Sequence, residues 1–175
     1  MAFPVFIING FLDSGKTTFI IDTLKNDGFH KQGNTLLLVC EEGEVEYDKK
    51  ELESYNVQVE VFDDIDDFSA EKLYELTEQY HPDRIIIEPS GVGKLSDVVK
   101  AIDTITEETG ITIDAKIAVV DGKRAKMYMK NFGEFFNDQI GHASCIVLSR
   151  TTGMSEKKLQ DVVALLRQHN ETADI

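Results

Sequence analysis

Short apolar runs alternate with longer amphipathic stretches along the chain, and this alternation constrains the fold more than any other feature. Residues 84–88 read Arg-Ile-Ile-Ile-Glu, and three consecutive β-branched residues are typical of a strand covered on both faces. Because predicted strands alternate with predicted helices, we expect an α/β domain with a mostly parallel sheet and helices on both of its faces. The expected strands are 3–9, 35–40, 57–62, 84–88, 117–121 and 145–149, and the expected helices are 16–27, 70–80, 94–108, 123–137 and 155–168.

The size and charge of the chain narrow its function. Its 175 residues, of which 42% are hydrophobic, suit a single domain with a sizeable core. The 32 acidic residues outnumber the 18 basic ones, and the net charge of −14 argues against binding to nucleic acids or acidic membranes. No apolar run spans a bilayer and no signal-like segment precedes the first strand, so we expect a cytoplasmic protein. Cys40 and Cys145 are expected as free thiols, with one disulfide as the alternative.

A glycine-rich loop follows the first predicted strand and precedes the first predicted helix. Residues 10–17 read Gly-Phe-Leu-Asp-Ser-Gly-Lys-Thr, which satisfies the Walker A pattern G-x-x-x-x-G-K-[ST]. Glycines let the backbone wrap around phosphates, which then face successive N–H groups and a helix N-terminus. Lys16 would reach the β- and γ-phosphates, Thr17 would offer a hydroxyl to Mg²⁺, and Thr18 would reach the α-phosphate. The predicted nucleotide-binding residues of this loop are Gly10, Asp13, Ser14, Gly15, Lys16, Thr17 and Thr18.

A second signal lies in residues 85–93, which read Ile-Ile-Ile-Glu-Pro-Ser-Gly-Val-Gly. An apolar run that ends in an acid is the Walker B arrangement, and Glu88 would stand at the carboxyl end of a strand, where parallel sheets bind ligands. Glu88 would hold a magnesium-bound or attacking water, and Gly91 would let the backbone approach the γ-phosphate. Lys16 and Glu88 are therefore the predicted catalytic residues. Alone, this segment could be an acid followed by a turn, and its pairing with the first loop favours the site.

These motifs resemble those of the CobW-like P-loop GTPases, relatives of the UreG and HypB metal-insertion GTPases. Residues 10–18 are similar to the family's phosphate loop GFLGSGKTT, with Asp13 in place of a glycine, and residues 85–93 resemble its Walker B, where glutamate replaces the usual aspartate. The resemblance covers nearly the whole chain in order. Three further segments carry it: CEEGEVEYD at 40–48 against NEFGEVGID, IAVVDGKRA at 117–125 against the VVDA strand, and DQIGHASCIVLS at 138–149 against DQI-x-x-A-D-x-I-v-L-N.

The resemblance implies a Mg²⁺-dependent P-loop NTPase switch that binds and hydrolyses GTP or another purine nucleotide and assists the insertion or trafficking of a transition metal. Glu41 and Asp48 would belong to its switch region. The implied magnesium-binding residues are Thr17, Glu41 and Glu88, the last two directly or through water. The implied partners are the nucleotide, a metalloprotein client and a second copy of the chain in a homodimer. Because members usually carry a C-terminal domain that is absent from residues 1–175, we expect the GTPase domain alone.

The family's Cys-x-Cys-Cys metal-binding motif is missing from its usual place after the third strand. Residues 61–69 read Val-Phe-Asp-Asp-Ile-Asp-Asp-Phe-Ser instead. Thiolates suit Zn²⁺ or Cu⁺, whereas carboxylates suit harder ions such as Mg²⁺, Mn²⁺ or Ca²⁺. Two interpretations stay open: a second metal site retuned to a harder ion, or a solvated acidic turn in which metal handling is lost. The residues concerned are Asp63, Asp64, Asp66 and Asp67.

The family's guanine-binding motif, Asn-Lys-x-Asp, is also replaced, because residues 149–152 read Ser-Arg-Thr-Thr. The motif's aspartate accepts two hydrogen bonds from guanine that Thr152 cannot accept, and a site built for such bonds loses discrimination without them. Arg150 could still stack on a base. Ser149 and Arg150 are thus the predicted residues beside the base, and the preference for GTP over ATP stays open.

Three functions compete at this point. A magnesium-dependent NTPase switch leads because both phosphate motifs are present. A non-hydrolysing nucleotide-binding regulatory module is the alternative, which the altered base motif favours. A small-molecule kinase ranks last, because the arginines at 84, 124, 150 and 167 form no clustered lid-like stretch.

Overall fold

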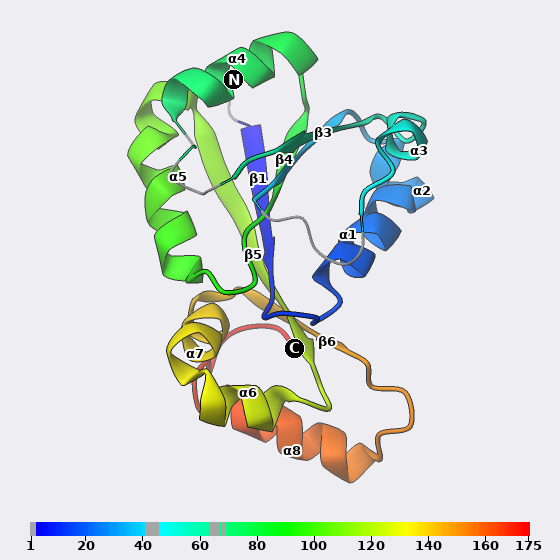
Figure 1. Ribbon diagram of the computed structural model, residues 1–175, viewed down its shortest axis with the longest axis vertical. Helices are drawn as coiled ribbons and strands as arrows, with labels where there is room; N and C mark the ends of the chain where they lie inside the picture. The colour runs from blue at the N-terminus through cyan, green and yellow to red at the C-terminus, as the bar shows by residue number, and fades with distance from the viewer. Residues whose placement is uncertain (1–2, 41–45, 64–66, 68) are drawn as a thin grey trace.

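The computed structural model describes residues 3–40, 46–63, 67 and 69–175. Within this part of the chain, six parallel strands form one sheet in the order β3-β2-β4-β1-β5-β6 (Figure 1). β1 lies between β4 and β5, so the loops that follow the carboxyl ends of these three parallel strands start side by side. The strands are β1 (Phe3–Asn9), β2 (Thr35–Val39), β3 (Val57–Val61), β4 (Arg84–Glu88), β5 (Ile111–Asp121) and β6 (Cys145–Ser149).

Eight helices accompany the sheet within the described residues. Buried side chains of α4 and α5 pack against one face of β1, β2 and β4, and those of α1 and α3 pack against the other face. β5 and β6 pack with α6, α7 and α8. The predicted α/β fold with helices on both faces is therefore confirmed. The helices are α1 (Lys16–Lys25), α2 (Asp27–His30), α3 (Lys49–Glu53), α4 (Ala70–Tyr80), α5 (Leu95–Thr109), α6 (Ala125–Asn131), α7 (Gly133–His142) and α8 (Glu156–Arg167).

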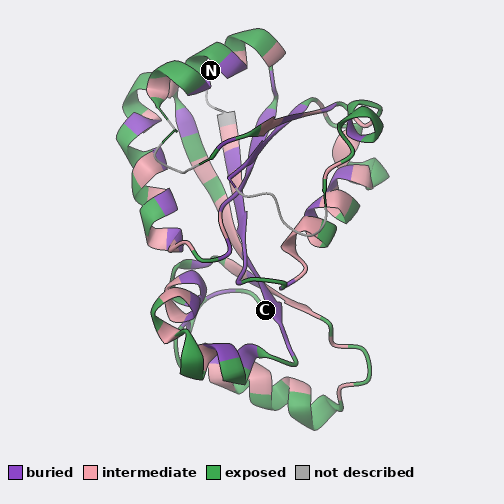
Figure 2. Ribbon diagram, in the orientation of Figure 1, coloured by how far each residue is buried: buried purple, intermediate pink, exposed green. Residues whose placement is uncertain are grey.

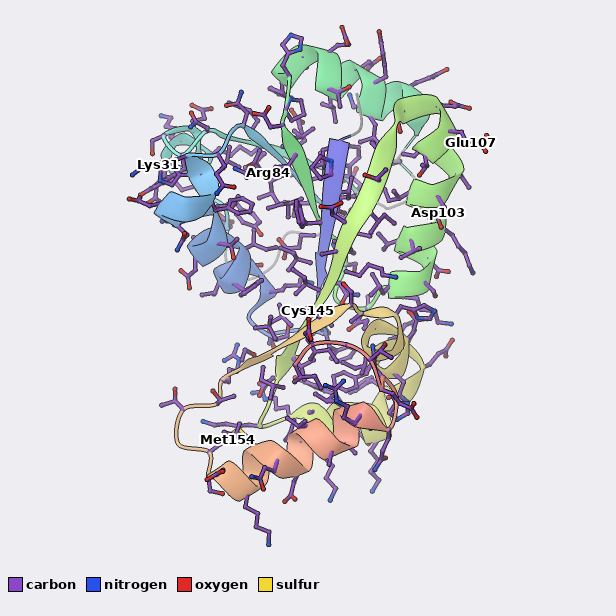
Figure 3. All side chains as sticks on the ribbon, turned by 180° about the vertical axis from the view of Figure 1, so that it is seen from behind. Lys31, Arg84, Asp103, Glu107, Cys145 and Met154 are labelled. Atoms are coloured by element: carbon purple, nitrogen blue, oxygen red, sulfur yellow. The ribbon has the colours of Figure 1, made fainter. Side chains whose placement is uncertain are left out.

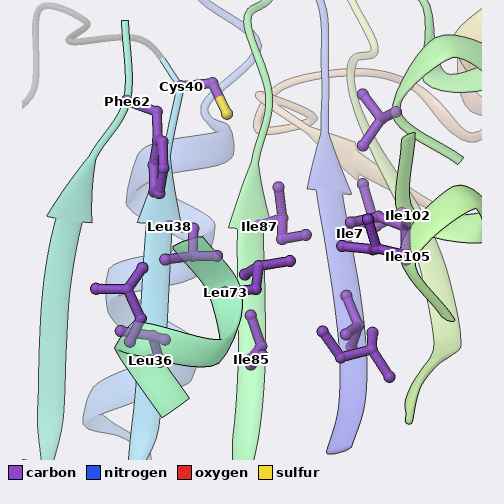
Figure 4. Packing of buried hydrophobic residues seen from close by; sticks show 14 of the residues in the cluster. Ile7, Leu36, Leu38, Cys40, Phe62, Leu73, Ile85, Ile87, Ile102 and Ile105 are labelled. Carbon is purple, nitrogen blue, oxygen red and sulfur yellow. The ribbon is translucent and has the colours of Figure 1, made fainter. Parts of the chain in front are cut away.

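The central strands β2 and β4 are buried along their whole length (Figure 2). Ile85 and Ile87 of β4 face Leu73 of α4, and α5 lies beside Ile7 of β1 in the same cluster (Figure 4). Ile86 belongs to the cluster on the opposite face, under α1. Burial of each such side chain stabilises the fold by about 1.5–3 kcal/mol. Since strand side chains alternate between faces, Glu88 continues on the α1 side of the sheet.

Arg84 begins β4 at the amino end of the strand, opposite to the end where the loops after β1, β4 and β5 leave the sheet. Its guanidinium donates to Thr35 Oγ1 at 2.8 Å and to the carbonyl oxygen of Phe29 at 2.6 Å, and it lies 3.8 Å from the centre of the Phe29 ring. Figure 3 marks its position, and it also marks Asp103 and Glu107, which are exposed on α5. Burial lowers the pKa of Arg84. Arg84 therefore fastens α2 to the sheet.

Several element boundaries differ from those predicted by apolar runs. β5 begins at Ile111, because residues 111–116 alternate polar and apolar side chains and pair with β1 across an irregularity between Val5 and Phe6. The predicted helix 16–27 ends at Lys25, where the side chain of Asn26 accepts from Gly28 N and starts α2. The predicted helix 123–137 is two helices, since the backbone of Phe132 leaves the helical region.

Two further features complete the fold. Asp174, near the chain end, forms an isolated parallel bridge with Cys145 at the edge of the sheet. Cys40 and Cys145 are free cysteines, as predicted. None of the helices in the described ranges combines the length and apolar character needed to cross a membrane.

Candidate functional site

The pairing of β1 with β4 brings the two predicted phosphate motifs together. Ile7 stands opposite Ile87 in the sheet, so the loops that follow these strands start as neighbours. A Cβ on Gly91 would lie 3.1 Å from Lys16 Nζ and 3.1 Å from Leu12 N. The backbone at Gly91 therefore lies against the phosphate loop, as its predicted role requires. Residues 9–18, 47 and 88–93 are called the phosphate side below.

The loop between β1 and α1 has the backbone that a phosphate cradle needs. Gly15 has a φ of 89° and Asp13 a φ of 56°, both in the left-handed region. A Cβ on Gly10 would lie 2.4 Å from Ser14 Oγ and 2.6 Å from the Val119 carbonyl oxygen, so only glycine fits there. The ten-residue helix α1 starts at Lys16 with no acidic side chain in its first turn. Its N-terminus suits an anion.

Thr17 and Glu88 meet on the phosphate side although 71 positions separate them in the chain. Thr17 Oγ1 donates a hydrogen bond of 2.8 Å to Glu88 Oε1. The Glu88 side chain is 2% exposed, so its carboxylate is held in a fixed orientation by buried contacts. The structure thus brings Lys16 and Thr17 together with Glu88 and Gly91. Their roles in nucleotide binding and catalysis stay predictions.

Tyr47 is a member of this site that sequence reasoning missed. Its hydroxyl donates to Glu88 Oε2, the second carboxylate oxygen. Burial raises the pKa of Tyr47, and the Glu88 charge adds to the rise, so the hydroxyl stays protonated and acts as a donor. The signal was present in the sequence: the segment at 40–48 has an aromatic residue where the resembling family pattern has isoleucine.

Two buried polar side chains lie at the base of the phosphate loop. Asn9, the last residue of β1, is 1% exposed, and Ser14 is 2% exposed. Among the described residues, neither amide atom of Asn9 nor the hydroxyl of Ser14 has a hydrogen-bond partner. Buried polar groups are nearly always paired, so we expect water or a ligand to complete the hydrogen bonds of these atoms. Asn9 was also missed, and its signal was a polar residue at the end of an apolar run.

The predicted base-side residues, Ser149 and Arg150, contact the phosphate loop itself. Ser149 Oγ donates to the Ser14 carbonyl oxygen at 2.5 Å and lies 3.2 Å from that of Val120. Arg150 Nη2 donates to the Asp13 carbonyl oxygen at 2.8 Å. These contacts span more than 130 positions of sequence. Both residues therefore stabilise the phosphate loop through its backbone carbonyl groups.

Asp121 does not replace the missing aspartate of the base motif. Its Oδ1 accepts from the backbone N–H groups of Lys123 and Arg124, at 2.9 and 3.2 Å. Its Oδ2 lies 3.4 Å from Arg150 Nε, and the side chain is 1% exposed. Both oxygens are committed to internal contacts, and Thr152 is exposed. Asp121 and residues 149–152 are called the base side below.

The remaining predicted metal ligands are only partly described. Glu41, Asp64 and Asp66 lie outside the described residues. Asp63 and Asp67 are exposed. Asp48, from the switch segment, accepts from Glu51 N at 3.0 Å and begins α3. Within the described ranges, no three His, Cys, Asp or Glu side chains are grouped to hold a metal ion.

A parallel sheet with a Walker A loop after β1 and an acid at the end of the neighbouring strand defines a P-loop nucleoside triphosphatase fold. Residues 4–175 match the family model described as the nucleotide-binding domain of CobW/HypB/UreG. The match covers nearly the whole chain, and the protein belongs to this family.

Curated relatives agree with this assignment. The chain is 31% identical over 165 residues to the zinc chaperone YeiR of Escherichia coli, which covers 88% of this chain and 49% of YeiR. It is 28% identical to the zinc chaperone CobW of a Sinorhizobium species, covering 85% of this chain and 51% of that protein. The chain thus spans about half the length of these relatives.

Solved structures support the fold. The Zn(II)-bound YjiA GTPase from E. coli has a TM-score of 0.72 at 21% identity, covering 95% of this chain and 54% of that chain. The hydrogenase maturation factor HypB from Archaeoglobus fulgidus has a TM-score of 0.63 at 16% identity, covering 99% of this chain and 79% of that one. At these identities the likeness concerns the fold alone.

Proposed function

We propose that this chain is the nucleotide-binding and nucleotide-hydrolysing domain of a Mg²⁺-dependent switch that assists metal trafficking. The observation that carries the proposal is the contact between Thr17 and Glu88 beside the phosphate loop, 2.8 Å long and built from two separate motifs. Residues 1–175 act as one domain in this proposal. GTP or another purine nucleoside triphosphate is the substrate.

The phosphate loop binds the triphosphate tail. Backbone N–H groups of residues 10–17 surround the phosphates, and Lys16 adds a positive charge at the β- and γ-phosphates. Gly91 lies beside Lys16, which lets the loop after β4 reach the γ-phosphate. Ser14 and Asn9 supply buried polar groups at the base of the loop.

Magnesium fits the donor set of the site. Thr17 and Glu88 converge with oxygen atoms only, and oxygen is the donor that Mg²⁺ prefers. Thr17 donates a hydrogen bond to Glu88 and would offer its oxygen lone pairs to the ion, and Glu88 would hold the ion directly or through water. When bound, Mg²⁺ would neutralise charge on the β- and γ-phosphates. Glu41 is a third proposed ligand.

Hydrolysis requires a positioned water more than covalent chemistry. Glu88 is the proposed residue that holds this water, because it is buried at the end of β4, immediately before the loop that carries Gly91. Tyr47 and Thr17 fix its two carboxylate oxygens. A fixed carboxylate loses little entropy when the reaction occurs.

We propose that the cargo is a transition metal, because two relatives are named zinc chaperones. The chain lacks the Cys-x-Cys-Cys motif at residues 61–69, and the described Asp63 and Asp67 are exposed carboxylates. Such oxygen donors suit harder ions than zinc. A metalloprotein client and a homodimer are proposed as partners on the same family basis.

A non-hydrolysing nucleotide-binding module is the second candidate. The base side favours it, because Ser149, Arg150 and Asp121 are engaged in internal contacts. A kinase has less support, since Arg84 fastens α2 at the far edge, and Arg167 donates to the carbonyl oxygens of Asn170, Glu171 and Ala173.

Phosphate release with GTP and with ATP tests the proposal. The assay uses high protein concentration, Mg²⁺ and candidate transition metals, with Lys16→Ala as the inactive control and the exposed Lys31→Ala as the matched control. Turnover that Lys16→Ala abolishes and Lys31→Ala keeps supports the hydrolase. Binding without turnover favours the regulatory module, and no nucleotide binding at all contradicts both.

A further inference from the structure

The loop 89–94, which follows Glu88, is fastened to α7 by a buried glutamine. Gln139 Nε2 donates to the carbonyl oxygen of Gly91 at 3.1 Å and to that of Gly93 at 2.9 Å. The Gln139 side chain is 1% exposed. Moving the loop would leave buried polar groups unpaired, which costs free energy. The two hydrogen bonds from Gln139, called the clamp below, therefore fix the loop backbone.

Two more contacts from α7 hold the far end of the loop. The Asp138 carboxylate accepts from Ser96 N at 3.1 Å and from Ser96 Oγ at 2.7 Å, in the first turn of α5. Glu134 Oε1 lies 2.7 Å from Lys94 Nζ. Residues 134 and 138 are four positions apart on α7, so they lie on one helix face. α7 therefore contacts the loop at its middle and at its end.

α7 is itself firmly anchored. Asn170 Nδ2 donates to the carbonyl oxygens of Ile140 and Ala143, both at 2.8 Å, and Asn170 is 7% exposed. Phe136 and Ile140 are buried in the cluster with β5 and β6. The loop is thus fastened to a helix whose position is fixed by the rest of the domain.

The hydrogen bond from Gln139 to Gly91 also sets the orientation of the loop peptide on the phosphate side. A trans peptide bond points its C=O and the next N–H in opposite directions, so turning the Gly91 carbonyl toward α7 turns the N–H of Val92 away from α7. Within the described residues, that N–H makes one long contact, 3.4 Å, with Ser90 Oγ. Gly91 itself stands beside Leu12 N and Lys16 Nζ.

We propose that Gln139 is a positioning residue that fixes loop 89–94 so that its backbone reads the terminal phosphate. Gln139 thereby sets the preference of the site for a triphosphate over a diphosphate. The inference rests on the proposed nucleotide function. It also gives a role to the Asp-Gln-Ile segment at 138–140, to which the phosphate site alone gives none.

The first test needs no nucleotide. Gln139→Met keeps the length and volume of the side chain and removes the donor. We expect amide hydrogen exchange in residues 90–94 to become about tenfold faster in this variant, because a buried hydrogen-bond donor is lost. The matched control is Gln160→Met, at an exposed glutamine on α8. Unchanged exchange in residues 90–94 would overturn the clamp.

The second test separates positioning from folding. Titration of GTP and GDP in Mg²⁺ should show about a tenfold loss of the triphosphate preference in Gln139→Met, with GDP affinity kept. Equal losses for both nucleotides, or no loss, would overturn the positioning role. If the wild type binds neither nucleotide, the proposed function fails, while the exchange experiment still decides the clamp. Should Gln139→Met not fold, Ser96→Ala removes one α7 contact and should shift the same ratio by a smaller factor.

Discussion

The phosphate side and the base side touch through Ser149 and Ser14, yet their polar groups are used differently. On the phosphate side, Thr17 and Tyr47 converge on one buried carboxylate, and Asn9 and Ser14 keep polar atoms without a partner in the described part of the chain. On the base side, Ser149, Arg150 and Asp121 contact the protein itself. The unpaired atoms of Asn9 and Ser14 suit a ligand, whereas the base-side contacts support the phosphate loop.

We infer that the two halves of the proposed nucleotide site are under separate constraints. A phosphate tail needs backbone N–H groups, a positive charge and oxygen donors for Mg²⁺, and the residues proposed for these roles lie on the phosphate side. A base needs paired acceptors at the correct position, and Thr152 does not offer them. We therefore expect nucleotide affinity to depend strongly on the phosphate chain and weakly on the base.

The largest effect is expected at Glu88. Glu88→Gln keeps the side-chain shape and an acceptor for Thr17 but loses the negative charge, so hydrolysis should fall about a hundredfold while triphosphate binding persists. Single-turnover phosphate release measures this. Glu71→Gln, an exposed position on α4, is the control. Unchanged turnover in Glu88→Gln would place the catalytic group elsewhere.

A pair of glycines compares the packing of the two sides. Gly10→Ala brings a Cβ within 2.6 Å of the Val119 carbonyl oxygen, and we expect it to lower the free energy of unfolding by about 1–3 kcal/mol. Gly153→Ala, just after the base motif, meets nothing within 4 Å but has a φ of 78°, so about 1 kcal/mol is expected.

Urea unfolding of the two variants gives this comparison directly. Gly10→Ala should also weaken nucleotide binding, whereas Gly153→Ala should not. Equal destabilisation, or a larger effect at Gly153, would mean that the phosphate loop is not as closely packed as described.

Restoring an acceptor on the base side should sharpen the difference. Thr152→Asp adds two carboxylate oxygens at an exposed position, and we expect the ratio of GTP to ATP affinity to rise about tenfold. Thr151→Asp carries the same charge at the neighbouring position and serves as the control. If both variants change both affinities alike, the missing aspartate does not set the base preference of the site.

The smallest effect is expected at Tyr47. Tyr47→Phe keeps the ring and removes the donor to Glu88, so turnover should fall about threefold with nucleotide affinity unchanged. Steady-state kinetics separates the two quantities, and Tyr74→Phe, at an exposed tyrosine, is the control. A change in affinity without a change in turnover would argue that Tyr47 shapes binding instead of orienting Glu88.

The sequence predicted the sheet, its covered faces and the meeting of the two phosphate motifs. These follow from period and spacing: consecutive apolar residues in β4 mark a buried strand, and adjacent parallel strands end at one edge. The predicted helix 155–168 is also confirmed as α8, which begins where the Ser155 side chain accepts from Lys158 N.

What the sequence did not reveal depends on contacts between distant segments. Tyr47 reaches Glu88 across 41 positions, and Gln139 reaches Gly91 across 48. Asn9 is isolated only because the surrounding packing buries it. Residues 111–116 of β5 were missed because half of them are polar and several remain exposed or partly exposed. No local pattern encodes such contacts.

A calorimetric titration of GTP, ATP, GDP and ADP, with and without Mg²⁺, is the decisive measurement. We expect tight, Mg²⁺-dependent binding of triphosphates, with GTP and ATP affinities within about tenfold of each other because the base side lacks paired acceptors. A GTP affinity more than about a hundredfold above that of ATP would contradict the reading of the base side, and the absence of any nucleotide binding would contradict the account as a whole.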